Sequence, residues 1–336
     1  MTPDSYGDPE NETALVRSSS GITDLSYRGK LTISGKDHIK LLQGMLTNDM
    51  VKLETWSGNH VTALTVKGRI LADIRAFKFP DFMFLDLEDG QQSVLAEHLN
   101  KFKLSYRAEI KDSTADFFHF HICGPESAEN IKSLLKADTG GLTEYGSKTI
   151  DFNGSELFMI KINRTGETGF DLITSREHGE GLFGEFTGNG IKPFGNLAFN
   201  TMRIEAGIPA YGIDMDENTI PIEAGLWDAL DFEKGCYIGQ EVIARIKWRG
   251  RVNWHLVGFE TAGKSEITAG NKIFNENKEI GRITSTTFSQ TLNKTLALGY
   301  IRREFKDAGT GVSVNHGENS YLNATVCELP FINNFK

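Results

Sequence analysis

The residues best suited to binding or catalysis in this 336-residue chain lie between positions 203 and 251. Within this segment Cys236 stands between a glycine and a tyrosine, and Lys234 lies two positions before it. Flanking glycines allow close approach of the backbone, and a nearby cation favours the thiolate form of a cysteine. Spacing alone nevertheless favours the commoner role of a lone cysteine, a small buried apolar side chain. Cys236 is therefore a candidate reactive thiol with a packing role left open.

Charged side chains surround this cysteine in the sequence. Glu205 lies near the end of an expected helix, and a carboxylate there can pair two-pronged with an amidine-like donor pair such as that of a pterin. An ordinary ion pair with Arg203 or a distant lysine is the alternative. Four basic residues alternate between positions 245 and 251. They either recruit carboxylates, such as a folate's glutamate tail, or form the solvated edge of a strand.

Further polar residues occur inside apolar runs. Asp73 interrupts the run that begins at Ile70, and because an unpaired buried carboxylate is costly, the pattern alone favours a position facing solvent. His119 and His121 share one face of an expected strand, but no third ligand of suitable spacing follows, so no metal site is expected. The chain contains no P-loop, no H-E-x-x-H and no G-x-S-x-G motif.

The elements that must position these residues follow from hydrophobic periodicity. Helices are expected at about 36–46, 91–102, 125–136, 176–186 and 195–206, with Gly207 ending the last. Strands are expected at about 30–34, 61–66, 70–79, 82–87, 117–123, 157–162 and 170–173. Frequent hairpins and irregular alternation with helices favour an α+β fold with antiparallel sheets. After position 251, six short strands between Gly, Asn and charged turns indicate a small barrel or sandwich.

Composition limits the function classes. A chain of this length is expected to form two or three domains, and its net charge of −9 argues against general nucleic-acid binding. No apolar run is long enough to cross a bilayer, and the polar segment 1–20 resembles neither a secretory signal nor a transit peptide. Three cysteines without a spacing motif indicate a reduced compartment. We therefore expect a cytoplasmic protein whose first twenty residues are flexible.

The octapeptide 234–241, K-G-C-Y-I-G-Q-E, resembles the signature of the YgfZ-type folate-binding proteins that assist iron–sulfur cluster maturation. Nearly the whole chain is similar to the wider superfamily, which includes the aminomethyltransferase, or T-protein, of the glycine cleavage system. The similar segments are G-I-T-D-L-S at 21–26, L-Q-G at 42–44, L-T-N-D at 46–49, T-G-E-T-G-F at 165–170, R-I-E-A-G at 203–207 and Y-G at 211–212.

The resemblance implies a three-lobed ring of mixed and antiparallel sheets with helices around a central tetrahydrofolate site. Residues 21–250 would form a folate-binding α+β region of two interleaved subdomains, and residues 251–336 a C-terminal small β-barrel. Cys236 and Asp73 would be catalytic, with Asp73 near the reacting nitrogens of folate. Glu205 would hold the pterin. The other residues implied to bind the cofactor are Glu167, Tyr211, Lys234, Arg245 and Arg249.

Three functions are compatible with these features. The first is a folate-binding assistant in the assembly or repair of iron–sulfur enzymes, with Cys236 as its thiol and iron–sulfur enzymes or cluster-assembly proteins as partners. The alternative is an aminomethyltransferase acting with tetrahydrofolate on an aminomethyl-lipoyl carrier protein. Against the alternative, the transferase segment G-A-R-D reads L-A-F-N at 197–200, and its paired aspartates read Ala72-Asp73. The third is a non-enzymatic scaffold that senses folate.

Overall fold

The computed structural model describes residues 2–317 and 320–335. Position 1 of the expected flexible segment, and positions 318, 319 and 336 of the expected barrel domain, lie outside the described residues. Within the described part, the helices are α1 (Pro9–Ser18), α2 (His38–Met45), α3 (Gln91–Lys103), α4 (Ser127–Leu135), α5 (Gly179–Gly188), α6 (Asn196–Glu205) and α7 (Gln240–Arg249), with short helical turns η1 (Thr114–Asp116), η2 (Trp227–Ala229) and η3 (Arg303–Phe305).

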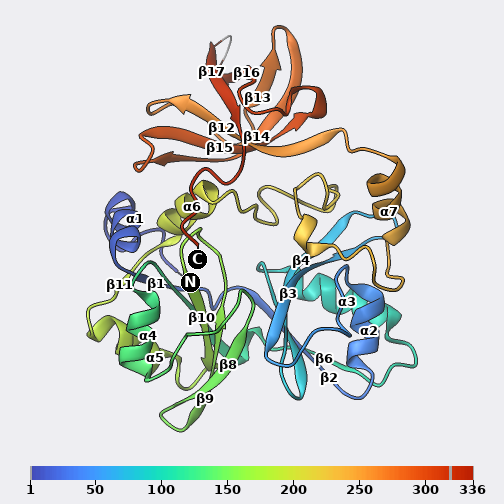
Figure 1. The fold of residues 1–336 in the computed structure, drawn as a ribbon, viewed down its shortest axis with the longest axis vertical. Helices are drawn as coiled ribbons and strands as arrows, with labels where there is room; N and C mark the ends of the chain where they lie inside the picture. The colour runs from blue at the N-terminus through green and yellow to red at the C-terminus, as the bar shows by residue number, and fades with distance from the viewer. Residues whose placement is uncertain (1, 318–319, 336) are drawn as a thin grey trace.

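The strands alternate with these helices along the chain. They are β1 (Gly21–Asp24), β2 (Gly29–Ser34), β3 (Ser57–Leu64), β4 (Ile70–Lys78), β5 (Phe82–Leu87), β6 (Glu109–Asp112), β7 (Phe117–Cys123), β8 (Ser147–Phe152), β9 (Ser155–Lys161), β10 (Gly169–Ser175), β11 (Lys192–Pro193), β12 (Trp254–Ala262), β13 (Lys272–Asn275), β14 (Lys278–Ser289), β15 (Lys294–Arg302), β16 (Gly311–Gly317) and β17 (Ser320–Cys327). They form three lobes, with the barrel at the top of Figure 1 and two sheets side by side below it.

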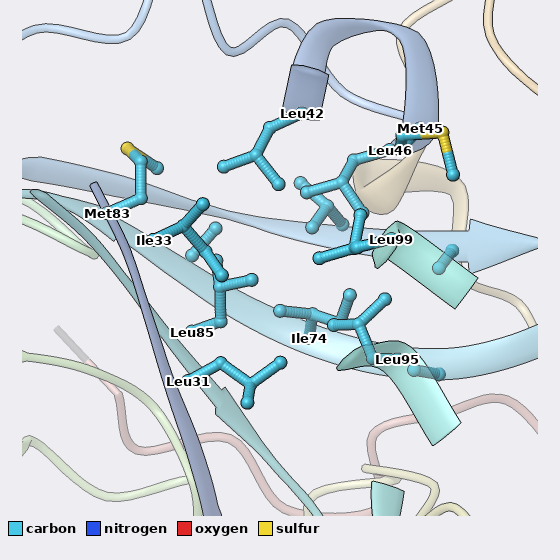
Figure 2. Close-up of a cluster of buried hydrophobic side chains, with 14 of the residues drawn as sticks. Leu31, Ile33, Leu42, Met45, Leu46, Ile74, Met83, Leu85, Leu95 and Leu99 are labelled. Carbon is cyan, nitrogen blue, oxygen red and sulfur yellow. The ribbon is translucent and has the colours of Figure 1, made fainter. Parts of the chain in front are cut away.

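The first lobe is a five-stranded antiparallel sheet in the order β3-β4-β5-β2-β6. Leu31 and Ile33 alternate along β2 and are both fully buried, as their period of two predicts. Helices α2 and α3 cover this face and add Leu42 and Leu99 to the same core. Figure 2 shows these side chains meeting between the sheet and the two helices. The lobe therefore provides a rigid platform for whatever lies on the opposite face of the sheet.

The second lobe is a six-stranded sheet in the order β11-β1-β7-β10-β9-β8. Its β1–β11 pair is parallel, whereas the other pairs are antiparallel. Helices α4 and α5 cover it with Ile131, Leu182 and Phe186. The chain enters this sheet with β1, builds the whole first lobe with β2–β6, and returns with β7. The two lower lobes are therefore interleaved in sequence.

An aromatic cluster joins the two lower lobes. Phe77, Phe79 and Phe84 come from the first sheet and its β4–β5 hairpin, while Phe158 and Ile173 come from the second sheet. The rings of Phe79 and Phe158 stack with their centroids 4.4 Å apart. Stacked aromatic pairs contribute beyond their buried area, so this contact fixes one sheet against the other.

The third lobe is a closed barrel in the order β12-β15-β14-β13-β16-β17. Strand β12 closes it by pairing with β15 along its length and with β17 around Phe259. Ile273, Ile283 and Val314 fill the interior. The α+β class with a small C-terminal barrel, predicted from the strand pattern and the resemblance, is confirmed.

Helix α6 connects the barrel with the lower lobes, because it packs against β14, β15 and α1. The helix ends as predicted: Gly207 follows with φ of 68°, a backbone conformation that favours glycine. A side chain at Gly207 would also meet Leu329 of the C-terminal segment, whose nearest atom lies 2.9 Å from the added Cβ position. Glu205, the last residue of α6, is thereby held between the lobes and the C-terminal segment.

Two predicted segments differ in the structure. Residues 1–20, expected to be flexible, contain α1, which begins at Pro9 after the N-cap Asp8 and carries Arg17 in its last turn. The basic residues after position 245, considered as a strand edge, lie instead in α7 and just beyond it. Along residues 2–317 and 320–335, no helix combines the length and apolar character needed to cross a membrane.

Candidate functional site

The last residue of α6 and the loop before β10 bring two carboxylates to one cation. Arg17 of α1 forms ion pairs with Glu205 through Nη2 and with Glu167 through Nη1. The side chain of Glu205 is 1% exposed, that of Glu167 5% and that of Arg17 12%. Charges this well buried persist only when paired, and each carboxylate here has the same guanidinium as its partner. Two residues that the resemblance assigns to the cofactor are thus brought together.

One oxygen of this cluster has no partner. Among the described residues, Glu205 Oε1 is buried and accepts no hydrogen bond. Buried polar atoms without partners are rare in folded proteins, so an unused carboxylate oxygen in this position calls for an explanation, such as a group that binds there. Because a carboxylate oxygen is an acceptor, the missing group must present an N–H or O–H donor.

The C-terminal segment forms a wall of the same site. The backbone N–H of Ile332 donates to the carbonyl oxygen of Glu205 at 2.9 Å, and that of Asn334 donates to the carbonyl oxygen of Gly166 at 2.9 Å. The side-chain amide of Asn334 also donates to Glu167 Oε1 at 2.8 Å. Figure 1 shows the C-terminus between the three lobes. The carboxylate pair therefore lies in the interior of the ring.

Asp73 lies on β4 and is 5% exposed, so the pattern-based expectation that it faces solvent is wrong. Arg75 Nη1 donates to Asp73 Oδ2 at 2.6 Å, and His60 Nε2 contacts Asp73 Oδ1. Burial would raise the pKa of Asp73, but Arg75 and His60 outweigh it and hold that pKa well below its usual range. Burial and the charge of Arg75 lower the pKa of His60. At neutral pH the cluster therefore holds an ionised carboxylate beside a neutral imidazole.

Glu144 lies between this cluster and the Glu167 loop. Burial raises the pKa of Glu144, while a hydrogen bond from the backbone of Asn163 and the charge of Arg75 act in the opposite direction. Asn163 in turn accepts the backbone N–H of Gly166 at 2.8 Å. Glu144 is therefore a neighbour of both the Asp73 cluster and the loop that carries Glu167.

The octapeptide segment is anchored at several points, but its cysteine is free. Lys234 Nζ donates to the carbonyl oxygens of Gln43, Leu46 and Asn48 at 2.9, 2.6 and 2.7 Å. Burial lowers the pKa of Lys234 to about 8, against the opposing charges of nearby aspartates. Lys234 thus holds the segment against the end of α2, which is a structural role rather than a contact with Glu205. Cys236 itself is exposed.

Two further positions of the octapeptide have packing roles. Tyr237 is buried in the apolar cluster of segment 206–253. Gly239 has φ of 85°, and a side chain there would meet the carbonyl oxygen of Thr65 at 2.6 Å. Burial raises the pKa of the Cys123 thiol to about 12 and that of the Cys327 thiol to about 11. The exposed cysteine is therefore the one that the sequence singled out.

The other expected cofactor residues are not placed beside Glu205. Arg245 and Arg249 lie one helical turn apart on the exposed face of α7, which Figure 1 shows at the outer edge of the molecule. Tyr211 packs against the apolar cluster of segment 206–253, where burial and the charge of Glu217 raise its pKa to about 12. The structure records no contact of these three residues with Glu205 or Asp73.

His119 and His121 belong to a separate buried network. His119 Nε2 lies 2.9 Å and His121 Nδ1 2.8 Å from the carboxylate of Asp171. Arg164 pairs with both Asp171 and Asp86. In the part of the chain that the structure describes, no group of three or more His, Cys, Asp or Glu side chains is placed to hold a metal ion. The two histidines therefore contribute to an ion-pair network between the lower lobes.

Two sheets interleaved in sequence and a closed barrel make up this fold, and known domain families match its two parts. Residues 2–234 match the GCVT N-terminal domain, and residues 255–333 match the glycine cleavage T-protein C-terminal barrel domain. The match to the first domain covers more than half of the chain. The chain belongs to the T-protein superfamily.

Relatives similar over most of their length carry one name. An aminomethyltransferase of Caldanaerobacter subterraneus is 29% identical over 313 residues, which cover 90% of this chain and 83% of that protein. An aminomethyltransferase of Thermosynechococcus vestitus is 28% identical, with coverages of 98% and 89%. The crystal structure of aminomethyltransferase T of the glycine cleavage system from Bartonella henselae superposes with a TM-score of 0.91 at 22% identity, covering 100% of this chain and 93% of that one. This last likeness concerns the fold.

Proposed function

We propose that the ring interior binds tetrahydrofolate and that the protein is a tetrahydrofolate-dependent transferase of the aminomethyltransferase kind. The observation that carries this proposal is the free, buried oxygen of Glu205 in the ring interior, and the ionised carboxylate of Asp73 on β4 supports it. The names of the full-length relatives support the same conclusion.

The residues present fit tetrahydrofolate on chemical grounds. Glu205 Oε1 is free to accept an N–H group. A carboxylate can accept both donors of a pterin edge, one on each oxygen, when its second oxygen is shared with another donor. When bound, tetrahydrofolate supplies the nitrogens that take up a one-carbon unit. Glu167 and the Asn334 amide border the ring edge that Glu205 would bind.

Asp73 has the properties of an electrostatic catalyst. Its carboxylate stays ionised because Arg75 and His60 hold its pKa low, so it does not act as a general acid at neutral pH. A fixed negative charge in a buried site stabilises positive charge that develops on a reacting nitrogen in the transition state. His60, neutral and hydrogen-bonded to Asp73, keeps that carboxylate in place.

A second candidate function is the assistance of iron–sulfur enzyme assembly or repair. The observation that favours it is Cys236, an exposed thiol on a segment pinned by Lys234 and Gly239. Rigid presentation of one thiol suits a transient ligand or a transfer step. The relatives reported above are named aminomethyltransferases, so this candidate ranks second, and iron–sulfur partners remain a proposal that rests on the octapeptide.

One comparison of variants separates the two candidates. In a strain lacking the gene, glycine cleavage and iron–sulfur enzyme activities are measured after complementation with wild type, Asp73→Asn or Cys236→Ser. A transferase requires Asp73 and tolerates Cys236→Ser, because aminomethyl transfer needs no protein thiol. A maturation factor gives the reverse order. If purified wild-type protein shows no tetrahydrofolate binding by calorimetry, both candidates fail.

A further inference from the structure

Arg17 connects three parts of the chain that are distant in sequence. It extends from the last turn of α1 to Glu167, before β10, and to Glu205, at the end of α6. Val16, the residue before it, is fully buried against Phe194 and Met202, which fixes the end of α1. Because α1 is packed in this way, the guanidinium is held at its two partners rather than free to sample solvent.

The charges of this cluster do not cancel. Two buried carboxylates face one guanidinium, which leaves one net negative charge. Without Arg17, the two carboxylates would be buried like charges, and one of them would take up a proton near neutral pH. A protonated Glu205 could no longer accept two N–H groups as a carboxylate does.

We propose that Arg17 is a positioning residue that keeps Glu205 ionised, engages its Oε2, and leaves Oε1 to accept from a neutral N–H donor pair. By compensating one of the two negative charges, Arg17 shifts the preference of the site away from a cationic ring and towards a neutral one. This inference rests on the proposed tetrahydrofolate site, and it adds a residue that lies in none of the motifs quoted above.

The neighbouring groups permit a clear pH test. The amide of Asn334 faces Glu167 from the C-terminal segment and does not titrate. The Cys123 thiol of β7 lies near Glu167 and Arg17, and burial raises its pKa to about 12. Arg203, on α6 itself, is paired with Asp214 at 2.8 Å. The Asn334 amide does not titrate and a guanidinium stays protonated between pH 5 and about 8, so a pH dependence gained when Arg17 is removed reports on the carboxylates that it had paired.

The first measurement needs no ligand. The free energy of unfolding is followed from about pH 5 to pH 7.5 for wild type, Arg17→Met and the charge-balanced double variant Arg17→Met/Glu167→Gln. A carboxylate whose folded pKa is raised loses its stabilising contribution as pH rises. Arg17→Met should therefore weaken relative to wild type as pH rises, and the double variant, with one buried carboxylate instead of two, should weaken less. Parallel curves for all three proteins would overturn the proposal.

The second measurement compares two ligands by calorimetry at pH 7. Tetrahydrofolate presents a neutral donor pair, and a 2,4-diaminopteridine binds a carboxylate as a protonated cation. Arg17→Met should lose about tenfold or more in affinity for tetrahydrofolate, the effect of one charged hydrogen bond, and lose less for the diaminopteridine. Equal losses for both ligands would mean that Arg17 is merely structural.

Two further outcomes are informative. If wild type binds neither ligand, the proposed function fails, while the ligand-free pH comparison still decides the role of Arg17. If Arg17→Met does not fold, Arg17→Lys replaces it, because an ammonium keeps the charge but contacts two carboxylates less well than a planar guanidinium. The difference in unfolding free energy between Arg17→Lys and wild type should then stay constant with pH. The variant should lose part of the tetrahydrofolate affinity, and full affinity would contradict the proposal.

Discussion

Two buried clusters in this protein pair arginine with carboxylates, yet they differ in how completely the oxygens are used. Between the lower lobes, Arg164 donates to Asp171 Oδ1 at 3.0 Å and Oδ2 at 2.6 Å, and to Asp86 Oδ2 at 2.7 Å. The other oxygen of Asp86 accepts from Arg28 at 2.8 Å. In the ring interior, by contrast, Glu205 engages one oxygen and leaves Oε1 free among the described residues.

This difference separates structural from functional use of buried charge. A cluster in which every carboxylate oxygen accepts a bond has nothing further to offer, and its contribution is to hold the lobes together. A cluster with one unused acceptor retains the desolvation cost of that atom until a ligand donates to it. Pairing alone therefore does not mark a site, whereas an unused carboxylate oxygen makes Glu205 a candidate for ligand binding.

The largest expected effect is a loss of stability in the cluster around Arg164, in which every carboxylate oxygen accepts a hydrogen bond. Arg164→Met leaves Asp86 and Asp171 buried without their shared partner, and breaking a buried pair in this way costs about 3–5 kcal/mol of unfolding free energy. Urea unfolding measures it. Arg107→Met removes an exposed pair with Asp37 and serves as the control, with no measurable loss expected. Similar stability of both variants would contradict the structural role given to this network.

The next largest effect is expected in the cluster of Arg17, Glu167 and Glu205, where one carboxylate oxygen is unused. Glu205→Gln should weaken tetrahydrofolate binding by about 1.5–3 kcal/mol, since the amide replaces one charged acceptor, and should affect unfolding less than Arg164→Met does. Calorimetry of both proteins gives the difference. The matched control is Glu97→Gln on the exposed face of α3, which should bind like wild type. Unchanged affinity in Glu205→Gln would remove Glu205 from the binding site.

The pH dependence of the unfolding free energy tests how the charge of Asp73 contributes to stability. Its folded pKa lies well below the ordinary value of 3.8, so its stabilising contribution is present above that value and is lost as pH falls below it. Asp73→Asn should therefore flatten the acid side of the stability curve by up to about 1.4 kcal/mol per pH unit. Urea unfolding at pH values from about 5 down to 2 provides the test. An acid slope equal to that of wild type would mean that folding does not lower the pKa of Asp73.

The smallest stability effect is expected at Cys236. Cys236→Ser changes an exposed side chain and should alter the free energy of unfolding by no more than about 0.5 kcal/mol. Brief alkylation of the native protein should mark Cys236 before Cys327 and Cys123, whose thiols burial keeps protonated. Mass spectrometry of the labelled peptides reads out the order, and earlier labelling of Cys327 would reverse the assignment of the accessible thiol.

Much of the fold was predictable because its strands carry clear period-two signals. Leu31 and Ile33 gave β2, and β7 was predicted at its observed bounds, 117–123. The helix α7 was misjudged because its basic residues alternate, although Val242, Ile243 and Ile246 have helical spacing and Ile243 is buried. Helix α1 had its own signal, Asp8 before Pro9 with acidic residues following, but its polar composition obscured it.

The candidate site was only partly predictable because its partners are distant in sequence. Glu205 and Glu167 came from motif resemblance, whereas the cation that joins them, Arg17, has no pattern of its own. Asp73 was expected to face solvent since its pairing depends on strand register. His60 lies directly across from Arg75 in the β3–β4 pair, which places both beside Asp73. A pattern along one strand does not reveal such cross-strand partners.

The stack of Phe79 on Phe158 has a consequence for the order in which the protein opens. Strands β4 and β5 cannot separate from β9 without exposing that shared aromatic cluster, whereas the barrel has an apolar interior of its own. Native-state amide hydrogen exchange should therefore release both lower sheets in a single cooperative step. The amides of the barrel should exchange in another.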